Sequence, residues 1–165
     1  MSQQTFSGED AARRFRDALG MFATGITVVT TRTPDGVPLG LTANSFNSVS
    51  LDPPLVVWSL ARDASLRLPF EGCEYYAINV LAADQEALSN RFASRVDDRF
   101  AGLEVERGEG GVPLLTGCCA RFVCRNTVRH PGGDHIVFIG EVVSFDREER
   151  PPLIYHGGVY RRLAG

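Results

Sequence analysis

The residues best suited to chemistry lie in one stretch, residues 41–54, which reads LTANSFNSVSLDPP. Its polar side chains are hydroxyls and amides: Thr42, Asn44, Ser45, Asn47, Ser48 and Ser50. The stretch separates two apolar runs, residues 26–31 and 55–60, whose composition is typical of core strands. Polar groups carried into a core are costly unless they are hydrogen-bonded. They could bind their own backbone in turns, or they could hold an anion or the edges of a heteroaromatic ring.

Three further places carry groups that a ligand could use. Asn79 lies among the apolar residues of AINVL and offers both a donor and an acceptor, although it could equally satisfy a neighbouring loop. His135 follows a Gly-Asp pair, where it could donate a proton, orient a substrate or stay solvated. Near the end of the chain, two glycines between aromatic residues in LIYHGGVY (153–160) permit close backbone approach.

The composition argues against several kinds of chemistry. All 17 basic residues are arginines, so no lysine is available for a Schiff base or a Walker A phosphate site. There is no GxSxG or HExxH motif. The net charge of −3 disfavours a nucleic-acid partner, and no apolar stretch is long enough to suggest a membrane partner.

The four cysteines are Cys73, Cys118, Cys119 and Cys124, and their spacing fits no zinc pattern. A metal site built with nearby histidines is conceivable, but we expect none. Reduced, buried thiols in a cytoplasmic protein are the simpler interpretation.

The elements that must position these groups are mostly short strands in hairpin order, and 165 residues suit one domain, 1–165. The patterns predict strands over 26–31, 37–44, 55–60, 75–81, 118–130, 135–145 and 157–163, and helices over 9–21, 61–70 and 83–93. We expect Ala87, Leu88 and Phe92 on the inner side of the third helix, and Asp52-Pro53-Pro54 to interrupt regular pairing. Hairpin order favours a mainly β (α+β) fold, an antiparallel barrel with peripheral helices. The chain has no βαβ pattern and no GxGxxG, which disfavours a Rossmann fold.

Five segments, taken in this order, resemble the flavin reductase family: FATGITVVTT, GLTANSFNSVSLDPPLVVWSL, YAINVLAADQEALSNRFA, GGDHIVFIGEV and PLIYHGGVYRRL. The resemblance runs from about Phe15 to Leu163 and implies a Greek-key FMN-binding split β-barrel. It also implies a homodimer with flavin near the subunit interface and an NAD(P)H:flavin oxidoreductase activity. The family includes the reductase components of two-component flavin monooxygenases, so an oxygenase component is an implied partner. One departure is Leu41, where relatives often carry Met.

The resemblance further implies which residues contact the ligands. Flavin contacts are expected from Thr42, Ala43, Asn44, Ser45, Ser48, Val49, Ser50, Ser59, Leu60, Ala61, Ser65, Arg67, Asn79, Val80 and Leu81. Of these, Ser59 to Ala61, Ser65 and Arg67 match positions near the phosphate or ribityl chain. His135 is implied as the catalytic residue, beside a nicotinamide pocket that includes Tyr155 and Tyr160.

The implied cofactor is FMN, with FAD as the alternative, and the implied co-substrate is NADH or NADPH. Flavin carries the redox chemistry, and the protein's task is to hold nicotinamide C4 against flavin N5. No side-chain nucleophile or metal is then required. Two other readings stay open: a barrel that binds flavin without turnover, and a pyridoxamine-phosphate oxidase. The second is disfavoured because no strongly basic phosphate pocket is evident.

Overall fold

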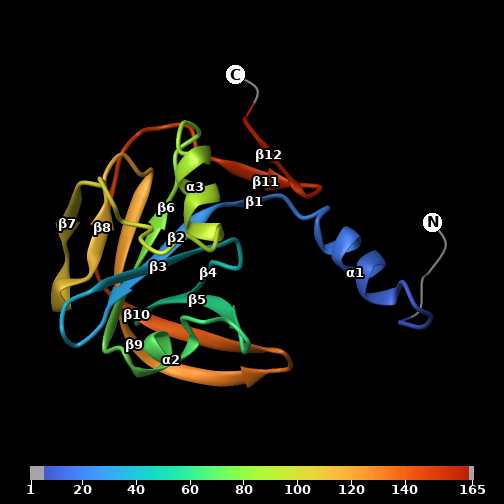
Figure 1. Ribbon diagram of the computed structural model, residues 1–165, viewed down its shortest axis with the longest axis horizontal. Helices are drawn as coiled ribbons and strands as arrows, with labels where there is room; N and C mark the ends of the chain where they lie inside the picture. The colour runs from blue at the N-terminus through green and yellow to red at the C-terminus, as the bar shows by residue number, and fades with distance from the viewer. Residues whose placement is uncertain (1–5, 164–165) are drawn as a thin grey trace.

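The computed structural model describes residues 6–163, and their main element is an antiparallel sheet of seven strands. Its spatial order is β3, β2, β6, β9, β10, β5, β4. The strands are β2 (Thr27–Arg32), β3 (Pro38–Ala43), β4 (Asn47–Leu51), β5 (Pro54–Ala61), β6 (Tyr75–Val80), β9 (Ala120–Gly132) and β10 (His135–Arg147). The sheet curls into a barrel that is split between its end strands, because β3 and β4 do not pair within residues 6–163 (Figure 1). This confirms the predicted antiparallel split barrel.

Two hairpins follow from their turn residues. Residues 33–36 read TPDG and join β2 to β3; Gly36 takes φ = 93°, and its N–H donates to the Thr33 carbonyl at 2.9 Å. The second hairpin joins β9 to β10 through Gly133, at φ = 66°. Both pairings agree with the sequence prediction.

The strand β4 corrects one expectation. The proline-rich end of the 41–54 stretch does not interrupt pairing, because β4 and β5 form a hairpin in which Leu51 faces Pro54. Only Asp52 and Pro53 form the turn. Pro54 is the first residue of β5, a position where its missing N–H is tolerated. Residues 47–51 of the polar stretch are therefore an edge strand rather than a loop.

The barrel interior is filled by aromatic and branched side chains. Trp58 is fully buried, and its ring stacks on Phe138 with centroids 4.6 Å apart. Phe70 and Tyr76 meet the same indole edge-on, at 5.1 and 5.7 Å. A second buried cluster, which includes Ile26, Leu81, Phe92, Leu115 and Leu153, lies under α3. Burying each of these large side chains stabilises the folded state by about 1.5–3 kcal/mol.

The three helices are α1 (Ala11–Leu19), α2 (Arg67–Gly72) and α3 (Glu86–Ala93), each shorter than predicted. On α3 the expected inner face was partly wrong. Phe92 is buried and Leu88 half-buried, but Ala87 is exposed and Ser89 is buried instead. Ser89 lies one turn before Phe92, so the two share a face, and its hydroxyl has a polar partner there.

Short strands complete the fold. β7 (Val105–Arg107) pairs with β8 (Pro113–Leu115) around the 3-10 turn η1 (Glu109–Gly111), within the predicted region of short elements. β1 (Thr24–Gly25), β11 (Ile154–His156) and β12 (Val159–Arg161) form a separate small sheet. Beyond this sheet, α1 projects away from the barrel (Figure 1).

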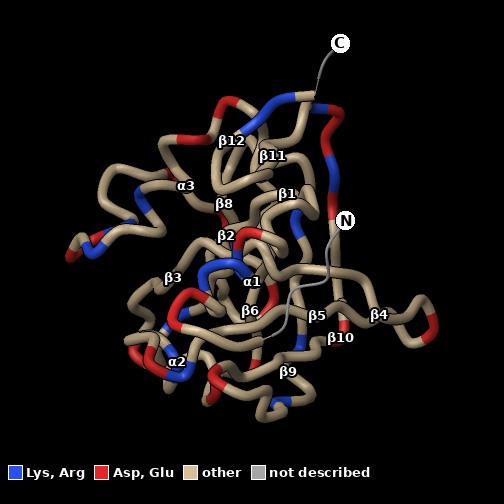
Figure 2. Tube along the Cα trace, turned by 90° about the vertical axis from the view of Figure 1, so that its right-hand side faces the viewer, with Lys and Arg blue, Asp and Glu red and all other residues tan. Residues whose placement is uncertain are grey.

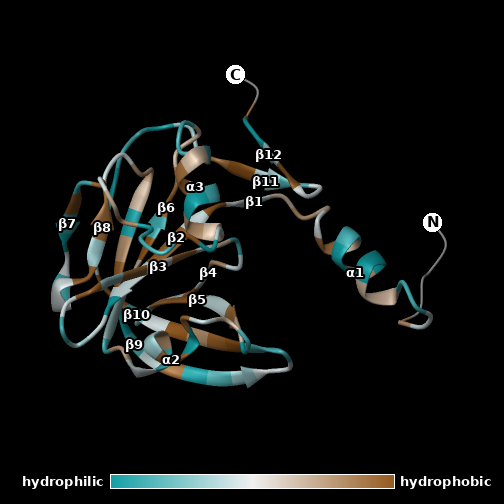
Figure 3. Cartoon of the chain, viewed as in Figure 1, coloured by the Kyte–Doolittle hydropathy of each residue, from teal (hydrophilic) through white to brown (hydrophobic). Residues whose placement is uncertain are grey.

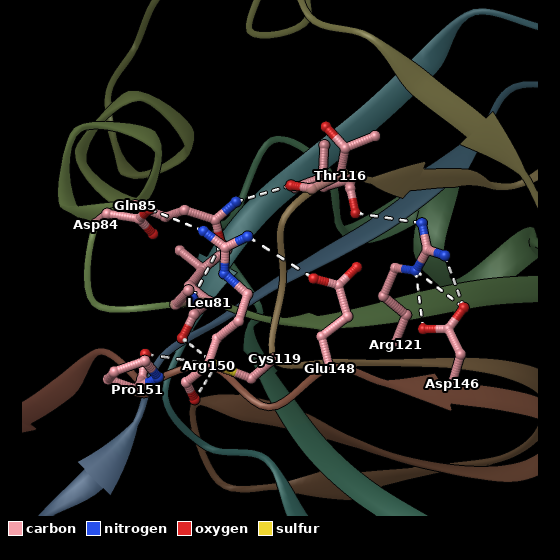
Figure 4. A network of polar contacts seen from close by, with 12 residues as sticks. Leu81, Asp84, Gln85, Thr116, Cys119, Arg121, Asp146, Glu148, Arg150 and Pro151 are labelled. Carbon is pink, nitrogen blue, oxygen red and sulfur yellow. Dashed lines mark hydrogen bonds and ion pairs between the residues drawn. The ribbon is translucent and has the colours of Figure 1, made fainter.

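The segment leading into β11 is fastened beside the start of α3 by a polar network (Figure 4). The Arg150 guanidinium lies 2.8 Å from the Asp84 carboxylate. The Cys119 thiol is 3.4 Å from the Arg150 carbonyl oxygen and 3.6 Å from those of Leu81 and Pro151. These contacts fix where β11, and with it Tyr155, begins. None of the helices in residues 6–163 has the length and apolar character needed to cross a membrane.

Candidate functional site

The polar stretch lies along the split of the barrel, where a serine pair ties it to β5. The Ser45 hydroxyl accepts from the Ser59 N–H at 2.9 Å and donates to the Ser59 carbonyl at 3.2 Å. A hydroxyl is the smallest side chain that can serve as donor and acceptor together. The loop between β3 and β4 is thereby fixed against the strand that carries Leu60 and Ala61.

The same end of β5 leads directly to the candidate catalytic histidine. His135 is the first residue of β10 and faces Ala61 across the strand pair. The Arg62 N–H donates to the Asp134 carbonyl at 2.9 Å, which closes this corner of the sheet. His135 Nδ1 lies 2.7 Å from Asp134 Oδ1, and this hydrogen bond lowers the pKa of Asp134 below its usual value. The imidazole is half-exposed and held in orientation by its neighbour.

The opposite end of the stretch is linked to the tyrosines. The Thr42 hydroxyl donates to the Ser89 carbonyl at 2.6 Å, and the Ser89 hydroxyl lies 2.8 Å from the Tyr160 hydroxyl. Tyr160 in turn donates to Asn90 Oδ1 at 3.0 Å. The Tyr155 and Tyr160 rings meet edge-on at 5.6 Å. Residues 42–45 therefore bridge two clusters, one around His135 and one around the tyrosines.

A glycine allows this second cluster to form. A Cβ added to Gly40 would lie 2.7 Å from Cε1 of Phe92, so any larger residue would push α3 away from β3. With glycine, α3 approaches closely enough for Thr42 to reach the Ser89 carbonyl. The sequence prediction did not include Ser89 or Asn90. The only available signal was a serine three residues before a core phenylalanine on a helix.

The stretch also carries polar groups that no protein atom uses. Among residues 6–163, the Asn44 amide and the Ser48 and Ser50 hydroxyls have no hydrogen-bond partner, and the N–H groups of residues 44–46 have no backbone partner. Free N–H donors beside small polar side chains suit the polar edge of a ring system or an anion. The donor set therefore fits a flavin.

Comparisons with known proteins decide the family. Residues 19–164 match the model of the flavin reductase like domain. The chain belongs to the flavin reductase family. It is 46% identical over 157 residues to the FMN reductase (NADH) SmoA of Agrobacterium fabrum, covering 95% of this chain and 89% of the relative. It is 46% identical to the reductase component of the flavin-dependent trigonelline monooxygenase of Acinetobacter baylyi, covering 90% of this chain and 48% of the relative.

Solved structures of flavin reductases are similar to this chain. The NADH:FAD oxidoreductase SgcE6 of Streptomyces globisporus, in complex with NAD and FAD fragments, superimposes with a TM-score of 0.89 at 36% identity, covering 98% of both chains. BorF, the flavin reductase component of a bacterial two-component tryptophan halogenase, gives a TM-score of 0.85 at 36% identity, covering 93% of this chain and 99% of BorF.

The expected flavin contacts of this flavin reductase family member are mostly accessible. Asn44, Ser45, Ser48 and Val49 are exposed, whereas Thr42, Ala43 and Ser50 are half-buried. Ser59 and Ala61 are half-buried, and the Leu60 side chain points into the core. Ser65 is exposed between β5 and α2; Arg67 begins α2 and pairs with Glu71 at 3.4 Å.

The expected contacts Asn79, Val80 and Leu81 are less accessible than those of the polar stretch. Asn79 is fully buried; its amide nitrogen donates to the Val28 carbonyl at 2.9 Å and to the Thr30 hydroxyl at 3.1 Å. Its amide oxygen accepts from the Leu115 N–H at 2.9 Å. Its three protein partners lie on the strands β2 and β8, so the protein itself uses both donors of this amide and one lone pair of its oxygen. A flavin contact of Asn79 stays a prediction. Leu81 is also fully buried, and Val80 is only half-buried beside it.

The polar stretch is an open surface among residues 6–163. A cavity of about 510 Å³ does exist, but it lies at the far end of α2, where its lining includes Arg32, Leu68, Cys73 and Tyr75 and no residue of the 41–54 stretch. The polar stretch itself faces outward, and Leu51 within it is 93% exposed. A ring resting on this stretch would need a second surface to cover it.

Proposed function

We propose that the chain transfers a hydride from NADH to FMN and releases reduced flavin to a separate oxygenase component. FAD and NADPH are the alternative substrates. Membership of the flavin reductase family carries the proposal, together with relatives named as an NADH-dependent FMN reductase and as monooxygenase reductase components. The bridging position of residues 42–45 supports it, because that segment connects the histidine cluster to the tyrosine cluster.

In this proposal the polar stretch and the start of α2 bind the flavin. Bound flavin supplies the acceptor for the hydride. The N–H groups of residues 44–46 and the Asn44, Ser48 and Ser50 side chains bind its polar edge, while Ser45 and Ser59 keep that loop in place. Ser65 and Arg67, at the start of α2, stand where the phosphate end would lie. Hydrogen-bond donors fixed in advance cost little reorganisation when charge develops near them.

His135 is proposed to orient the nicotinamide. Asp134 holds the ring through Nδ1, which leaves Nε2 without a protein partner among the described residues. The lowered pKa of Asp134 keeps its carboxylate ionised at neutral pH, so the orientation persists there. Tyr155 and Tyr160, tied to Thr42 through Ser89, are proposed to border the same pocket. No covalent step is assigned to any side chain.

The assembly and location are also proposals. We propose a homodimer, because the outward-facing polar stretch forms one wall of a site and lacks the other. We propose that residues 1–165 form one domain, since the family match covers 19–164. A cytoplasmic location is supported by four cysteines that are all free.

A turnover assay tests the activity. Purified protein at nanomolar concentration is mixed with NADH and excess FMN, and absorbance at the nicotinamide band is followed. Many turnovers per protein molecule support the reductase. A flat trace in a sample that binds FMN tightly favours the alternative, a barrel that holds flavin without turnover. Repeating the series with FAD and with NADPH assigns the preferred pair by kcat/KM.

A further inference from the structure

The hydroxyl of Tyr160 is held between two neighbouring side chains of α3. The Ser89 hydroxyl lies 2.8 Å from it, and Tyr160 donates to Asn90 Oδ1 at 3.0 Å. A tyrosine hydroxyl has one proton, so its bond to Asn90 leaves only acceptor capacity. The Ser89 hydroxyl must therefore be the donor in its contact with Tyr160. Toward a ligand as well, the Tyr160 oxygen can act only as an acceptor.

Ser89 can fix this direction because water does not reach it. Its side chain is fully buried within α3. A serine inside a helix often turns its hydroxyl back to the carbonyl four residues earlier, whereas this hydroxyl is directed at Tyr160 on β12. Tyr160 is half-buried and packs against the apolar cluster under α3. Figure 3 shows that α3 carries hydrophilic as well as hydrophobic residues, so the helix supplies both the packing and the polar contact.

The helix that carries both side chains is itself fastened to the polar stretch. The Thr42 hydroxyl donates to the Ser89 carbonyl at 2.6 Å, which holds α3 against the end of β3. On the other side, the Tyr155 ring meets the Tyr160 ring edge-on at 5.6 Å and limits how that ring can tilt. The Tyr160 oxygen is therefore held from α3 and from β11 together, at a fixed place relative to the segment proposed to bind flavin.

Positive charge lies close to this acceptor. Arg161 and Arg162 directly follow Tyr160, and both are exposed. Within residues 6–163 neither guanidinium has an ion-pair partner. Figure 2 shows the two arginines as a blue segment beside β12. Guanidinium groups bind phosphate oxygens well, often through two hydrogen bonds. An acceptor next to two available arginines suits a ligand that carries both an N–H donor and phosphate, as a dinucleotide does.

We propose that Tyr160 accepts a hydrogen bond from the carboxamide N–H of the nicotinamide, and that Ser89 and Asn90 are positioning residues that keep its hydroxyl an acceptor. The carboxamide carries the only N–H donors of a nicotinamide ring. A site built to pair with such a donor discriminates against an analogue that lacks it, because its own polar group is then left without a partner. This inference rests on the proposed function, since it assumes that nicotinamide binds beside the two tyrosines.

The acetylpyridine analogue of NADH tests the contact, because a methyl group replaces the carboxamide NH₂. The ratio of kcat/KM for NADH to kcat/KM for the analogue is measured with FMN and compared between variants, so that the analogue's own reactivity cancels. We expect this ratio to fall about fivefold in Tyr160→Phe and about threefold in Ser89→Ala. Ser94→Ala is the matched control, because the Ser94 hydroxyl donates to the Arg91 carbonyl at 2.7 Å at the end of the same helix, and its ratio should not change.

A purely structural role gives a different result. If Ser89→Ala only loosened α3, kcat/KM would fall equally for both dinucleotides and the ratio would stay at the wild-type value, which overturns the role of Ser89. An unchanged ratio in Tyr160→Phe overturns the carboxamide contact itself. Circular dichroism confirms that each variant is folded.

Asn90 is exposed and allows a rescue by a conservative variant. Asn90→Ala frees the Tyr160 proton, and the hydroxyl can then donate to the carbonyl oxygen that both dinucleotides carry. The ratio should therefore fall about threefold. Asn90→Asp keeps an acceptor oxygen for that proton and should keep the wild-type ratio. Equal ratios in the two variants contradict the proposed role of Asn90.

Binding of the oxidised dinucleotides separates this inference from the proposed function. NAD⁺ and its acetylpyridine analogue are titrated by calorimetry into the wild type and Tyr160→Phe. A wild-type preference for NAD⁺ that Tyr160→Phe loses supports the contact, and absence of NADH turnover with FMN in the same wild-type sample then refutes only the reductase. Turnover combined with a preference that Tyr160→Phe retains refutes only the contact. Absence of both dinucleotide binding and turnover refutes both.

Discussion

Replacing Asn79 with alanine should destabilise the fold strongly, because this side chain completes three buried hydrogen bonds. The substitution removes the bonds to the Val28 carbonyl, the Thr30 hydroxyl and the Leu115 N–H. Thr30 keeps its bond to the Pro113 carbonyl, but Leu115 is 2% exposed, so its N–H loses its acceptor without gaining water. One orphaned buried donor costs about 1–3 kcal/mol, and the lost bond to Val28 adds about 1 kcal/mol.

The expected loss in unfolding free energy is therefore about 3 kcal/mol, which lowers Tm by roughly 6–12 °C in a domain of this size. Denaturant unfolding followed by Trp58 fluorescence measures it, since Trp58 is fully buried in the native state. Asn44→Ala is the matched control: Asn44 is exposed and its amide has no partner among the described residues. We expect Asn44→Ala to leave Tm within 1–2 °C and to raise the KM for FMN roughly fivefold. Unchanged stability in Asn79→Ala with a raised KM for flavin would refute the structural role and restore the flavin contact.

Three further predictions concern His135, the Gly140–Tyr76 contact and the buried thiols. His135→Ala should lower kcat/KM for NADH about tenfold, or roughly 1.4 kcal/mol, without abolishing turnover; complete inactivity in a folded variant would contradict an orienting role. Gly140→Ala should lose about 1–3 kcal/mol of stability because its Cβ would clash with the Tyr76 hydroxyl. Tyr76→Phe should be nearly neutral and should partly rescue it, since that hydroxyl is buried without a partner in the described residues; additive losses would disprove the clash. Burial raises the pKa of Cys118 and Cys124 from 9.0 to about 12. The folding stability that the two protonated thiols contribute is therefore fully present below pH 9 and is lost as the pH rises from 9 to 12. Stability should fall by about 1.4 kcal/mol per pH unit for each thiol; an unchanged slope in Cys124→Ala would argue against it.

The strands and turns were predictable because their signals are local. The TPDG turn and the alternating runs around residues 118–145 specify two hairpins without reference to distant residues. The β4 strand was missed because its polar residues gave it the composition of a loop. It is an edge strand with exposed side chains, where burial does not select apolar residues.

The candidate site was only partly predictable because its decisive contacts link residues far apart in the chain. The Asn79 amide is used by Leu115, 36 positions later, and Ser89 meets Tyr160 across 71 positions. Whether an amide on a strand faces a ligand or a neighbouring loop depends on these distant partners, and composition cannot decide it. By contrast, Ser45 and His135 could be singled out from the sequence because each lies next to a turn or strand end that the local sequence specifies. Their ligand contacts stay predictions.

A crystal structure of the protein with FMN tests the central claim most directly, namely that the polar stretch binds flavin. We predict the ring against residues 44–50 and 59–61, with backbone N–H groups of residues 44–46 within about 3 Å of its polar edge. Flavin in the 510 Å³ cavity beside Arg32 and Tyr75, with the polar stretch still facing water, would contradict the account.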